Sequence, residues 1–187
     1  MNLPKGFLGS AVAAGLRKKP GLDVALLVAP AGASAAAVFT KNRFQAAPVV
    51  LSRAALKKSR GRVKAVVVNA GCANAVTGAE GLAAARRVQE SAADLAGCPR
   101  EEVFVASTGV IGVVLPDERV TTFLPDAFAR LSAGGIEAVS RAILTTDAHA
   151  VFDRLGLGAH LTPQRSNGLR SMVERIKVDA RAALQDA

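Results

Sequence analysis

The sequence predicts a layered α/β fold, in which the strands of one sheet alternate along the chain with the helices that cover it. Residues 63–68 (VKAVVV) are almost entirely apolar and largely β-branched, and unbroken hydrophobicity of this kind is typical of a strand covered on both faces. Residues 78–96 show helical periodicity, and Gly97 follows where such a helix should end. The apolar stripe of this helix consists of Leu82, Ala85, Val88, Ala92 and Leu95, and it lies opposite Arg86, Arg87, Gln89 and Glu90.

The other expected elements are shorter. A turn signal at Ala31-Gly32 separates the first two strands, and Pro125 should interrupt the helical region that begins at Asp117. We expect strands at 23–30, 36–40 and 103–107, an extended segment at 48–52 that leads into a helix at 53–58, and a further helix at 136–144.

The pattern changes after residue 147. Residues 148–163 have no clear period, whereas 167–187 predict an amphipathic helix. We therefore expect an N-terminal domain over 1–147 and a divergent tail over 148–187.

Composition limits the class of protein. Half of the 187 residues are hydrophobic and 21% are charged, which is a globular balance. No apolar run is long enough to span a bilayer, and the N-terminus does not resemble a secretory signal. We expect a cytoplasmic protein with no membrane partner.

The net charge of +9 raises the question of nucleic acid. The basic residues are scattered, and no aromatic residues alternate with them as a stacking surface would require, so a solvated basic surface is the favoured interpretation. Cys72 and Cys98 are isolated from each other and from the two histidines, His149 and His160, so no metal site is expected. Cys98 is interpreted as a small buried hydrophobic residue.

Three short segments could carry chemistry. Residues 69–75 (NAGCANA) join the strand at 63–68 to the long helix, and their oriented amides could hold an anion or position a neighbouring loop. Residues 107–112 (STGVIG) follow the second buried strand, where the Thr108 hydroxyl and the Gly109 N–H could form an oxyanion hole for acyl transfer. Thr145, Thr146 and Asp147 could hold a polar substrate. Taken singly, the first two segments are better explained as ordinary turns, and Asp147 could equally cap whatever follows it.

The order and spacing of these segments resemble the bifunctional ornithine acetyltransferase / glutamate N-acetyltransferase family. The resemblance extends over residues 4–147. The matching stretches are PKGF at 4–7, AAGL at 13–16, DVALL at 23–27, AVFTKN at 37–42, AAPV at 46–49, VVNAGCANAVTG at 67–78, STGVIG at 107–112, LP at 115–116 and AILTTD at 142–147.

The resemblance implies an acyltransferase of arginine biosynthesis. Family members transfer acetyl from N-acetylornithine to glutamate, and some accept acetyl-CoA as a co-substrate, with no other cofactor. It implies that Thr108 and Gly109 form the oxyanion hole, that Thr145, with Thr146 as its alternative, contacts substrate, and that Asn69, Gly71 and Asn74 belong to a structural loop near the site. It also implies a layered fold shared with self-processing aminopeptidases, and a heterotetramer of two chain pairs produced by cleavage before a nucleophilic threonine.

The sequence departs from this pattern after Asp147. The family's Lys-Gly-Ser-Gly segment and its Ala-Thr cleavage site have no match, so we expect a first-chain portion, incomplete on its C-terminal side, without a nucleophile and inactive alone. The tail could come from a truncated or frameshifted gene, could be a genuine replacement, or could be complemented by a separately encoded second chain. A catalytically silent binding or assembly domain is the main alternative function. A relative of the self-processing aminopeptidases and a nucleic-acid binder rank below it.

Overall fold

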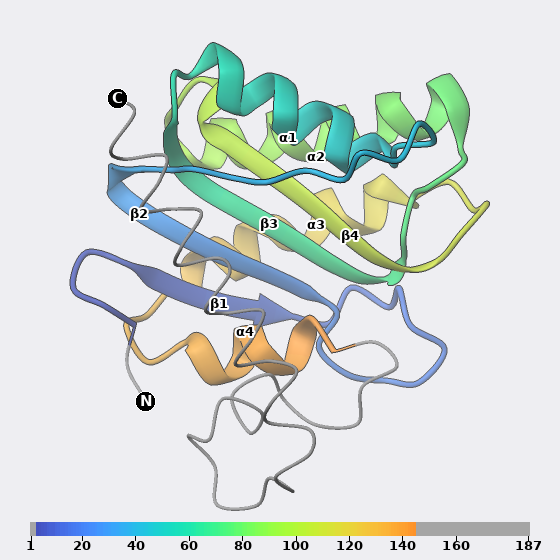
Figure 1. Cartoon of the computed structure of the whole chain (residues 1–187). Coiled ribbons are helices and arrows are strands. Elements are labelled where there is room, and N and C mark those ends of the chain that lie inside the picture. Colours follow the sequence, from blue (N-terminus) through green and yellow to red (C-terminus); the bar gives the residue numbers. More distant parts are fainter. Residues whose placement is uncertain (1–2, 145–187) are drawn as a thin grey trace, which may run out of the picture. The chain divides into compact units, whose positions relative to one another are not determined.

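The computed structural model describes residues 3–144, which form a four-stranded sheet with helices on both faces (Figure 1). The strands lie in chain order, β1-β2-β3-β4. The β1–β2 and β2–β3 pairs are antiparallel, and β3–β4 is parallel. The predicted layered α/β class is confirmed. The elements are β1 (Leu8–Val12), β2 (Val24–Ser34), α1 (Ala47–Lys58), β3 (Arg62–Cys72), α2 (Gly78–Ala96), a 3₁₀ turn (Arg100–Glu102), β4 (Val103–Val110), α3 (Asp117–Ala129) and α4 (Ile136–Ala142).

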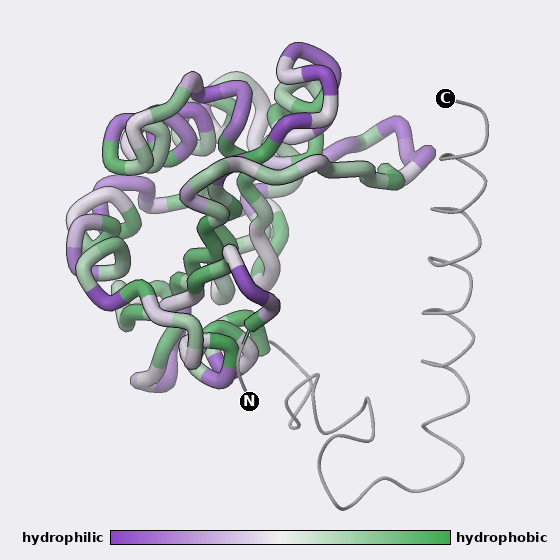
Figure 2. The backbone as a smooth tube through the Cα atoms, turned by 90° about the vertical axis from the view of Figure 1, so that its left-hand side faces the viewer, coloured by the Kyte–Doolittle hydropathy of each residue, from purple (hydrophilic) through white to green (hydrophobic). Residues whose placement is uncertain are grey.

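The main core lies between the sheet and the helices α1, α2 and α3. Alternate residues of each strand point into it, as the period of two requires. Figure 2 shows the hydrophobic stretches of the chain inside the fold and hydrophilic ones mainly on its outer turns. The most deeply buried side chains of this core are Val24, Leu26, Val67, Val103, Val120 and Leu124.

The opposite face of the sheet carries a smaller core. Helix α4 packs there on β1 and β2, where Ala11, Ala25, Val139 and Ala142 are buried together. On the same face of β3 and β4, Val66 and its register partner Phe104 are only half-buried.

Several predicted elements differ from the structure. Helix α1 already begins at Ala47, because Pro48 lies in its first turn, where a missing N–H costs no helical hydrogen bond. The predicted strand at 36–40 is irregular, and its Val38 is 80% exposed, so this apolar stretch has no described core to join. Strand β2 instead continues through Ala31-Gly32 with a register shift. Strand β1 was not predicted.

The helices also correct three expectations. Helix α3 runs through Pro125 without a break, and the fully buried Leu124 and Ala127 beside it supply packing that offsets the lost hydrogen bond. In α2, Gln89 is buried and donates to the Val103 carbonyl at 2.8 Å, whereas Leu95 is 40% exposed. Cys98 is only partly buried. The domain boundary at 147 and the helix at 167–187 lie outside the described residues.

Candidate functional site

The segments 69–75 and 107–112 lie side by side because of the sheet topology. Strands β3 and β4 are parallel, so their C-terminal ends lie at the same end of the sheet. Ala70 is the register partner of Thr108, and Gly71 is the partner of Gly109. The sequence indicated each segment separately, and the parallel pairing joins them.

Two glycines allow the backbones at this place to approach closely. Gly109 has φ +128°, and a Cβ placed on it would lie 2.6 Å from the Gly71 oxygen and 2.7 Å from the Cys72 nitrogen. Gly71 has φ +105°, and a Cβ there would lie 2.6 Å from the Leu16 oxygen. Three segments of main chain are thus stacked with no room for a side chain between them.

Asn69 links the two loops through its polar groups. It is 3% exposed, and its Nδ2 donates to the Cys72 carbonyl at 2.8 Å. Its Oδ1 accepts a 2.6 Å hydrogen bond from the Ser107 hydroxyl, and its backbone oxygen accepts a longer one, 3.3 Å, from the Thr108 hydroxyl. The hydroxyl of Thr108 is therefore held near β3 by a bond at the long end of the normal range.

The end of β4 is open to its surroundings. Thr108 is half-buried and Gly109 is exposed. Beyond them Val110 and Ile111 are 55% and 66% exposed. No described side chain closes over the pair, so another molecule or chain segment could reach it.

Asn74 has a structural place in the first loop. It is fully buried in the αL conformation (φ +47°), which asparagine tolerates better than most residues. Its Nδ2 donates to the Gly81 carbonyl at 2.8 Å, and its Oδ1 accepts from the Thr77 hydroxyl at 2.9 Å and from the Leu115 N–H at 3.4 Å. Asn74 thereby connects the loop to α2 and to the segment before α3.

Cys72 lies in the same loop and is buried. Its thiol is 3.3 Å from the Val113 carbonyl. Burial raises the pKa of this thiol above its ordinary value, and a hydrogen bond with the Asn74 backbone offsets part of that effect. The raised pKa gives Cys72 a smaller thiolate fraction at any given pH than an exposed cysteine, which makes it a weaker nucleophile.

The expected substrate contacts, Thr145 and Thr146, lie outside the described residues, which end at Leu144. The segment that leads to them is nevertheless placed. The Arg17 guanidinium donates to the carbonyls of Ala142 and Leu144, at the end of α4. The backbone N of Arg17 faces Gly71. One residue therefore contacts both the first loop and the end of α4, and no pattern in the sequence pointed to it.

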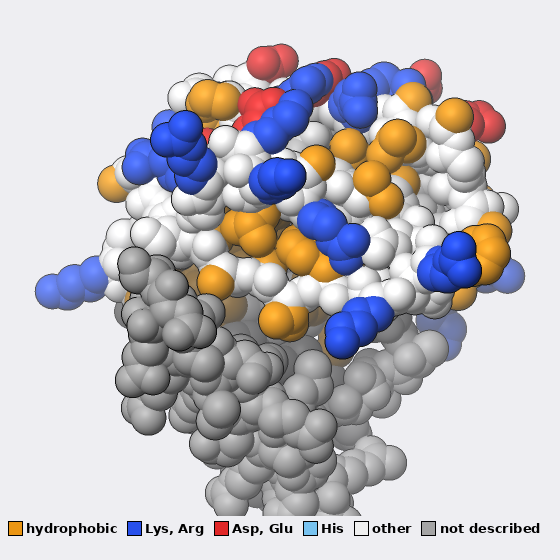
Figure 3. Space-filling model, turned by 45° about the horizontal axis from the view of Figure 1, so that its top comes forward, with side chains coloured by type: hydrophobic (Ala, Val, Ile, Leu, Met, Phe, Trp, Pro, Cys, Tyr) orange, Lys and Arg blue, Asp and Glu red, His pale blue; other side chains and the backbone are white. Residues whose placement is uncertain are grey.

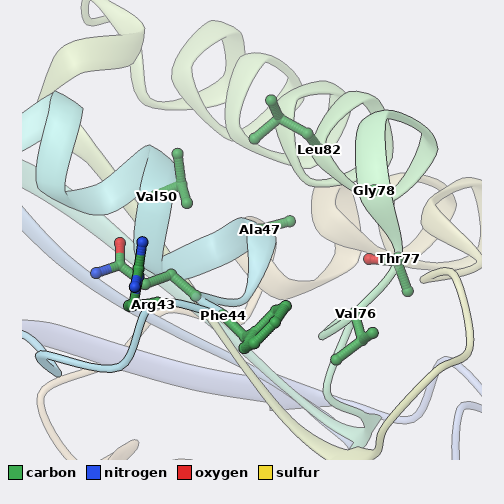
Figure 4. Close-up of a pocket in the computed structure, with 9 residues that line it drawn as sticks. Arg43, Phe44, Ala47, Val50, Val76, Thr77, Gly78 and Leu82 are labelled. Atoms are coloured by element: carbon green, nitrogen blue, oxygen red, sulfur yellow. The ribbon is translucent and has the colours of Figure 1, made fainter.

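A cavity of about 370 Å³ lies elsewhere, between the N-terminal ends of α1 and α2 (Figure 4). Phe44, Val50, Val76 and Leu82 line it, with Arg43 near its rim, and neither Thr108 nor Gly109 contributes to it. Sequence reasoning did not select these residues.

Three further features concern the distribution of charged, metal-ligating and apolar residues in the described part of the chain. Figure 3 shows Lys and Arg side chains as separate groups between hydrophobic ones, without a continuous basic stripe. Within residues 3–144, no group of three or more His, Cys, Asp or Glu could hold a metal ion. No helix in that range is both long and apolar enough to cross a membrane.

Comparison with known proteins gives consistent matches over the same region. The ArgJ family model matches residues 9–155. The arginine biosynthesis bifunctional protein ArgJ of Geobacter sulfurreducens is 44% identical over 143 residues, which are 76% of this chain and 36% of that protein. The protein of the same description from Nitratidesulfovibrio vulgaris is 46% identical over 145 residues, 78% of this chain and 37% of the relative. The chain thus spans little more than a third of the length of the curated relatives it matches.

Two solved structures are similar in fold. A crystal structure of arginine biosynthesis bifunctional protein ArgJ from Bacillus halodurans has a TM-score of 0.71 at 35% identity, over 78% of this chain and 75% of that one. The ornithine acetyltransferase of Mycobacterium tuberculosis, solved in complex with ornithine, has a TM-score of 0.73 at 34% identity, over 78% of this chain and 79% of that one.

Proposed function

Because the chain belongs to the ArgJ family of arginine biosynthesis, we propose that it supplies the oxyanion-stabilising part of an ornithine acetyltransferase. In this proposal Thr108 and Gly109 donate hydrogen bonds to the oxygen of an acetyl group while its carbonyl carbon is attacked. The attacking threonine belongs to a second chain. The acetyl group passes from N-acetylornithine through that threonine to glutamate.

The direction of the Gly109 N–H supports this role. Successive residues of a strand direct their N–H groups to opposite sides. Ala73 donates to the Val110 carbonyl at 2.9 Å, so Val110 faces β3. Val105 instead bonds to Ser52, on the side away from β3. Gly109 is four residues after Val105, so its N–H should point to the same side as that of Val105, and it precedes Val110, which points to the other side. We infer that the Gly109 N–H points away from β3, to the open edge of the sheet.

The exposure of the pair supports it as well. A glycine has no Cβ, so a reacting carbonyl oxygen can come within hydrogen-bond distance of its N–H. The Thr108 hydroxyl is held toward β3 by a single long bond to the Asn69 backbone oxygen. In the proposed role it leaves that acceptor and turns to the side of the Gly109 N–H, where both donors share one oxyanion. A charged oxygen is a stronger acceptor than a neutral carbonyl, which favours the exchange as negative charge develops.

The lengths of the relatives support a second chain. The matched stretch makes up little more than a third of the curated relatives but three quarters or more of the chains in the solved structures. The chains in those structures are therefore much shorter than the curated relatives. This difference fits a family protein that is divided into two chains, of which this sequence corresponds to the first.

The substrate assignment rests on the family. The relative from Mycobacterium tuberculosis is described as an ornithine acetyltransferase and was solved with ornithine. We propose the same substrate class for this chain, with Thr145 as a contact to N-acetylornithine and Thr146 as its alternative.

Complementation tests the proposal. The chain is co-expressed with the part of the Geobacter sulfurreducens relative that follows the matched stretch, and acetyl transfer from N-acetylornithine to glutamate is measured. We expect transfer only when both chains are present. Thr108→Ala should lower kcat by about 10²–10³-fold, the effect typical of one lost oxyanion donor.

Thr122→Ala is the matched control, because Thr122 is exposed on α3 and its hydroxyl bonds only to the Glu118 carbonyl in its own helix. It should leave kcat unchanged. Equal losses in both variants, or no transfer by a purified complex of the two chains, would contradict the proposal. Binding of N-acetylornithine by this chain without transfer in the complex would favour a silent binding domain instead.

A further inference from the structure

Asp23 organises the loop that precedes β2. Its carboxylate is almost completely buried, with 1% exposure. Oδ1 accepts a 2.6 Å hydrogen bond from the Ala14 N–H, and Oδ2 accepts bonds from the Leu16 N–H at 2.6 Å and the Arg17 N–H at 3.3 Å. Three backbone donors therefore converge on one carboxylate, and they fix the conformation of residues 14–17, which we call the strap.

The strap lies directly against the candidate site. The Leu16 carbonyl and the Arg17 nitrogen are the atoms that a Cβ on Gly71 would meet, at 2.6 Å and 3.2 Å. Gly71 in turn lies against Gly109. The same Asp23 also accepts a 2.8 Å bond from the Ala70 N–H through its backbone oxygen. Asp23 thus holds both the strap and the strand that the strap covers.

The strap contacts the end of α4 through the side chain of Arg17. The guanidinium donates to the Ala142 carbonyl at 2.5 Å and to the Leu144 carbonyl. The last carbonyls of a helix have no partner within the helix, and their partial negative charge favours a cation. The planar fork of arginine can engage two such oxygens at once, which a lysine ammonium does less well.

We propose that Asp23 and Arg17 are positioning residues of this site. Asp23 fixes the strap, and Arg17 holds the end of α4, at the Ala142 and Leu144 carbonyls, in place beside the loop of Gly71 that adjoins Gly109. The inference rests on the proposed function for its catalytic meaning, but the contacts exist independently of that function. Neither residue touches the reacting atoms, so the expected effect is on substrate affinity more than on the chemical step.

Amide hydrogen exchange on the whole chain tests the physical part. Arg17→Gln should speed exchange at the Ile143 amide, which donates to the Val139 carbonyl at the end of α4, by tenfold or more and leave the β2 and β3 amides unchanged. Arg17→Lys should restore part of the protection. Arg119→Gln is the matched control, because Arg119 also bonds to the strap, at the Gly15 carbonyl with 2.7 Å, without an observed bond to α4. Unchanged exchange in Arg17→Gln, or an equal increase in Arg119→Gln, would overturn the proposal.

The complemented enzyme tests the functional part. Arg17→Gln should raise KM for N-acetylornithine about tenfold and change kcat by less than threefold. A kcat loss with unchanged KM would overturn the positioning role. If the wild-type complex shows no transfer while Arg17→Gln still speeds exchange at the Ile143 amide, the proposed function fails and the strap stands. Asp23→Asn provides a second variant, and it should shift the Gly71 and Gly109 amide resonances; unchanged resonances would contradict the role of Asp23.

Discussion

The hydroxyl of Ser52 in α1 takes the place of a neighbouring strand for Val105 in β4. Its Oγ donates to the Val105 carbonyl at 2.8 Å and accepts from the Val105 N–H at 3.0 Å. Strand β4 is the edge of the described sheet, and both residues are buried. A single side chain therefore satisfies two backbone groups that would otherwise be unpaired in the core.

Replacement of this hydroxyl should destabilise the fold. Ser52→Ala leaves the Val105 N–H and carbonyl buried without partners, and we expect a loss of about 2 kcal/mol in the free energy of unfolding. Urea denaturation followed by circular dichroism measures it. Ser59→Ala, near the end of the same helix, removes only a 3.4 Å bond to the Leu56 carbonyl and should cost less than about 0.5 kcal/mol. Equal losses in the two variants would refute the role assigned to Ser52.

The glycine at the end of β4 should resist substitution. Gly109→Ala adds a methyl group against the Gly71 and Cys72 backbone in a conformation that L residues rarely adopt, so we expect a loss of more than about 2 kcal/mol. Gly112→Ala is the matched control, since Gly112 also has positive φ (+82°) but open space around it. It should cost about 1 kcal/mol, the conformational part alone. Thermal unfolding of both variants compares them, and similar melting temperatures would mean that the close approach is absent.

The ion pair between Arg87 and Asp117 should contribute modestly to stability. Two short bonds, 2.6 Å and 2.9 Å, join α2 to the first turn of α3, and the hydrogen bond with Asp117 raises the pKa of Arg87 above its usual range. The arginine side chain is 56% exposed, so solvent screening limits the gain. Asp117→Asn should lower the midpoint of urea denaturation slightly, and by more than the loss of a fully exposed ion pair. Glu137→Gln, which breaks the exposed pair with Arg141, should cost less than about 0.5 kcal/mol.

Both thiols should react slowly in the folded chain. Burial raises the pKa of Cys72 and of Cys98, so at a given pH each has a smaller thiolate fraction than an exposed cysteine. Modification by a thiol reagent across pH 7–10 should therefore rise at higher pH than in the urea-unfolded chain. For Cys98, Lys64 opposes the effect of burial, and Lys64→Ala should move its profile further upward. A folded profile below the unfolded one would contradict both assignments.

The sequence was sufficient for elements whose signal is local. Residues 78–96 form a helix with the predicted bounds, because periodicity, length and the Gly97 stop all agree. The glycine and asparagine loops after the two buried strands were also recognised. Their proximity became visible only through the parallel pairing of β3 with β4, which places the ends of two distant segments at one edge.

Other features depend on tertiary contacts that no single segment reveals. Gln89 has the polarity of a surface residue, yet it is buried because the Val103 carbonyl accepts its amide. Pro125 looks like a helix stop, but Leu124 and Ala127 beside it are fully buried and the helix continues. Arg17 is not part of any motif selected from the sequence, and its significance comes from carbonyls 125 and more residues away. In each case long-range packing overrides a local preference.

The facing glycines at positions 71 and 109 also determine where length variation can be accommodated. If β4 slipped by one residue along β3, Thr108 or Val110 would take the place of Gly109 opposite Gly71. The Cβ of either residue would then collide with main chain that only a glycine can adjoin. Insertions or deletions within residues 97–102 can therefore be absorbed before β4 begins, whereas a change of one residue between Val103 and Gly109 would misalign the whole pair. Homologous sequences should therefore vary in length before Val103, in the segment that corresponds to residues 97–102. They should keep the same number of residues between Val103 and Gly109.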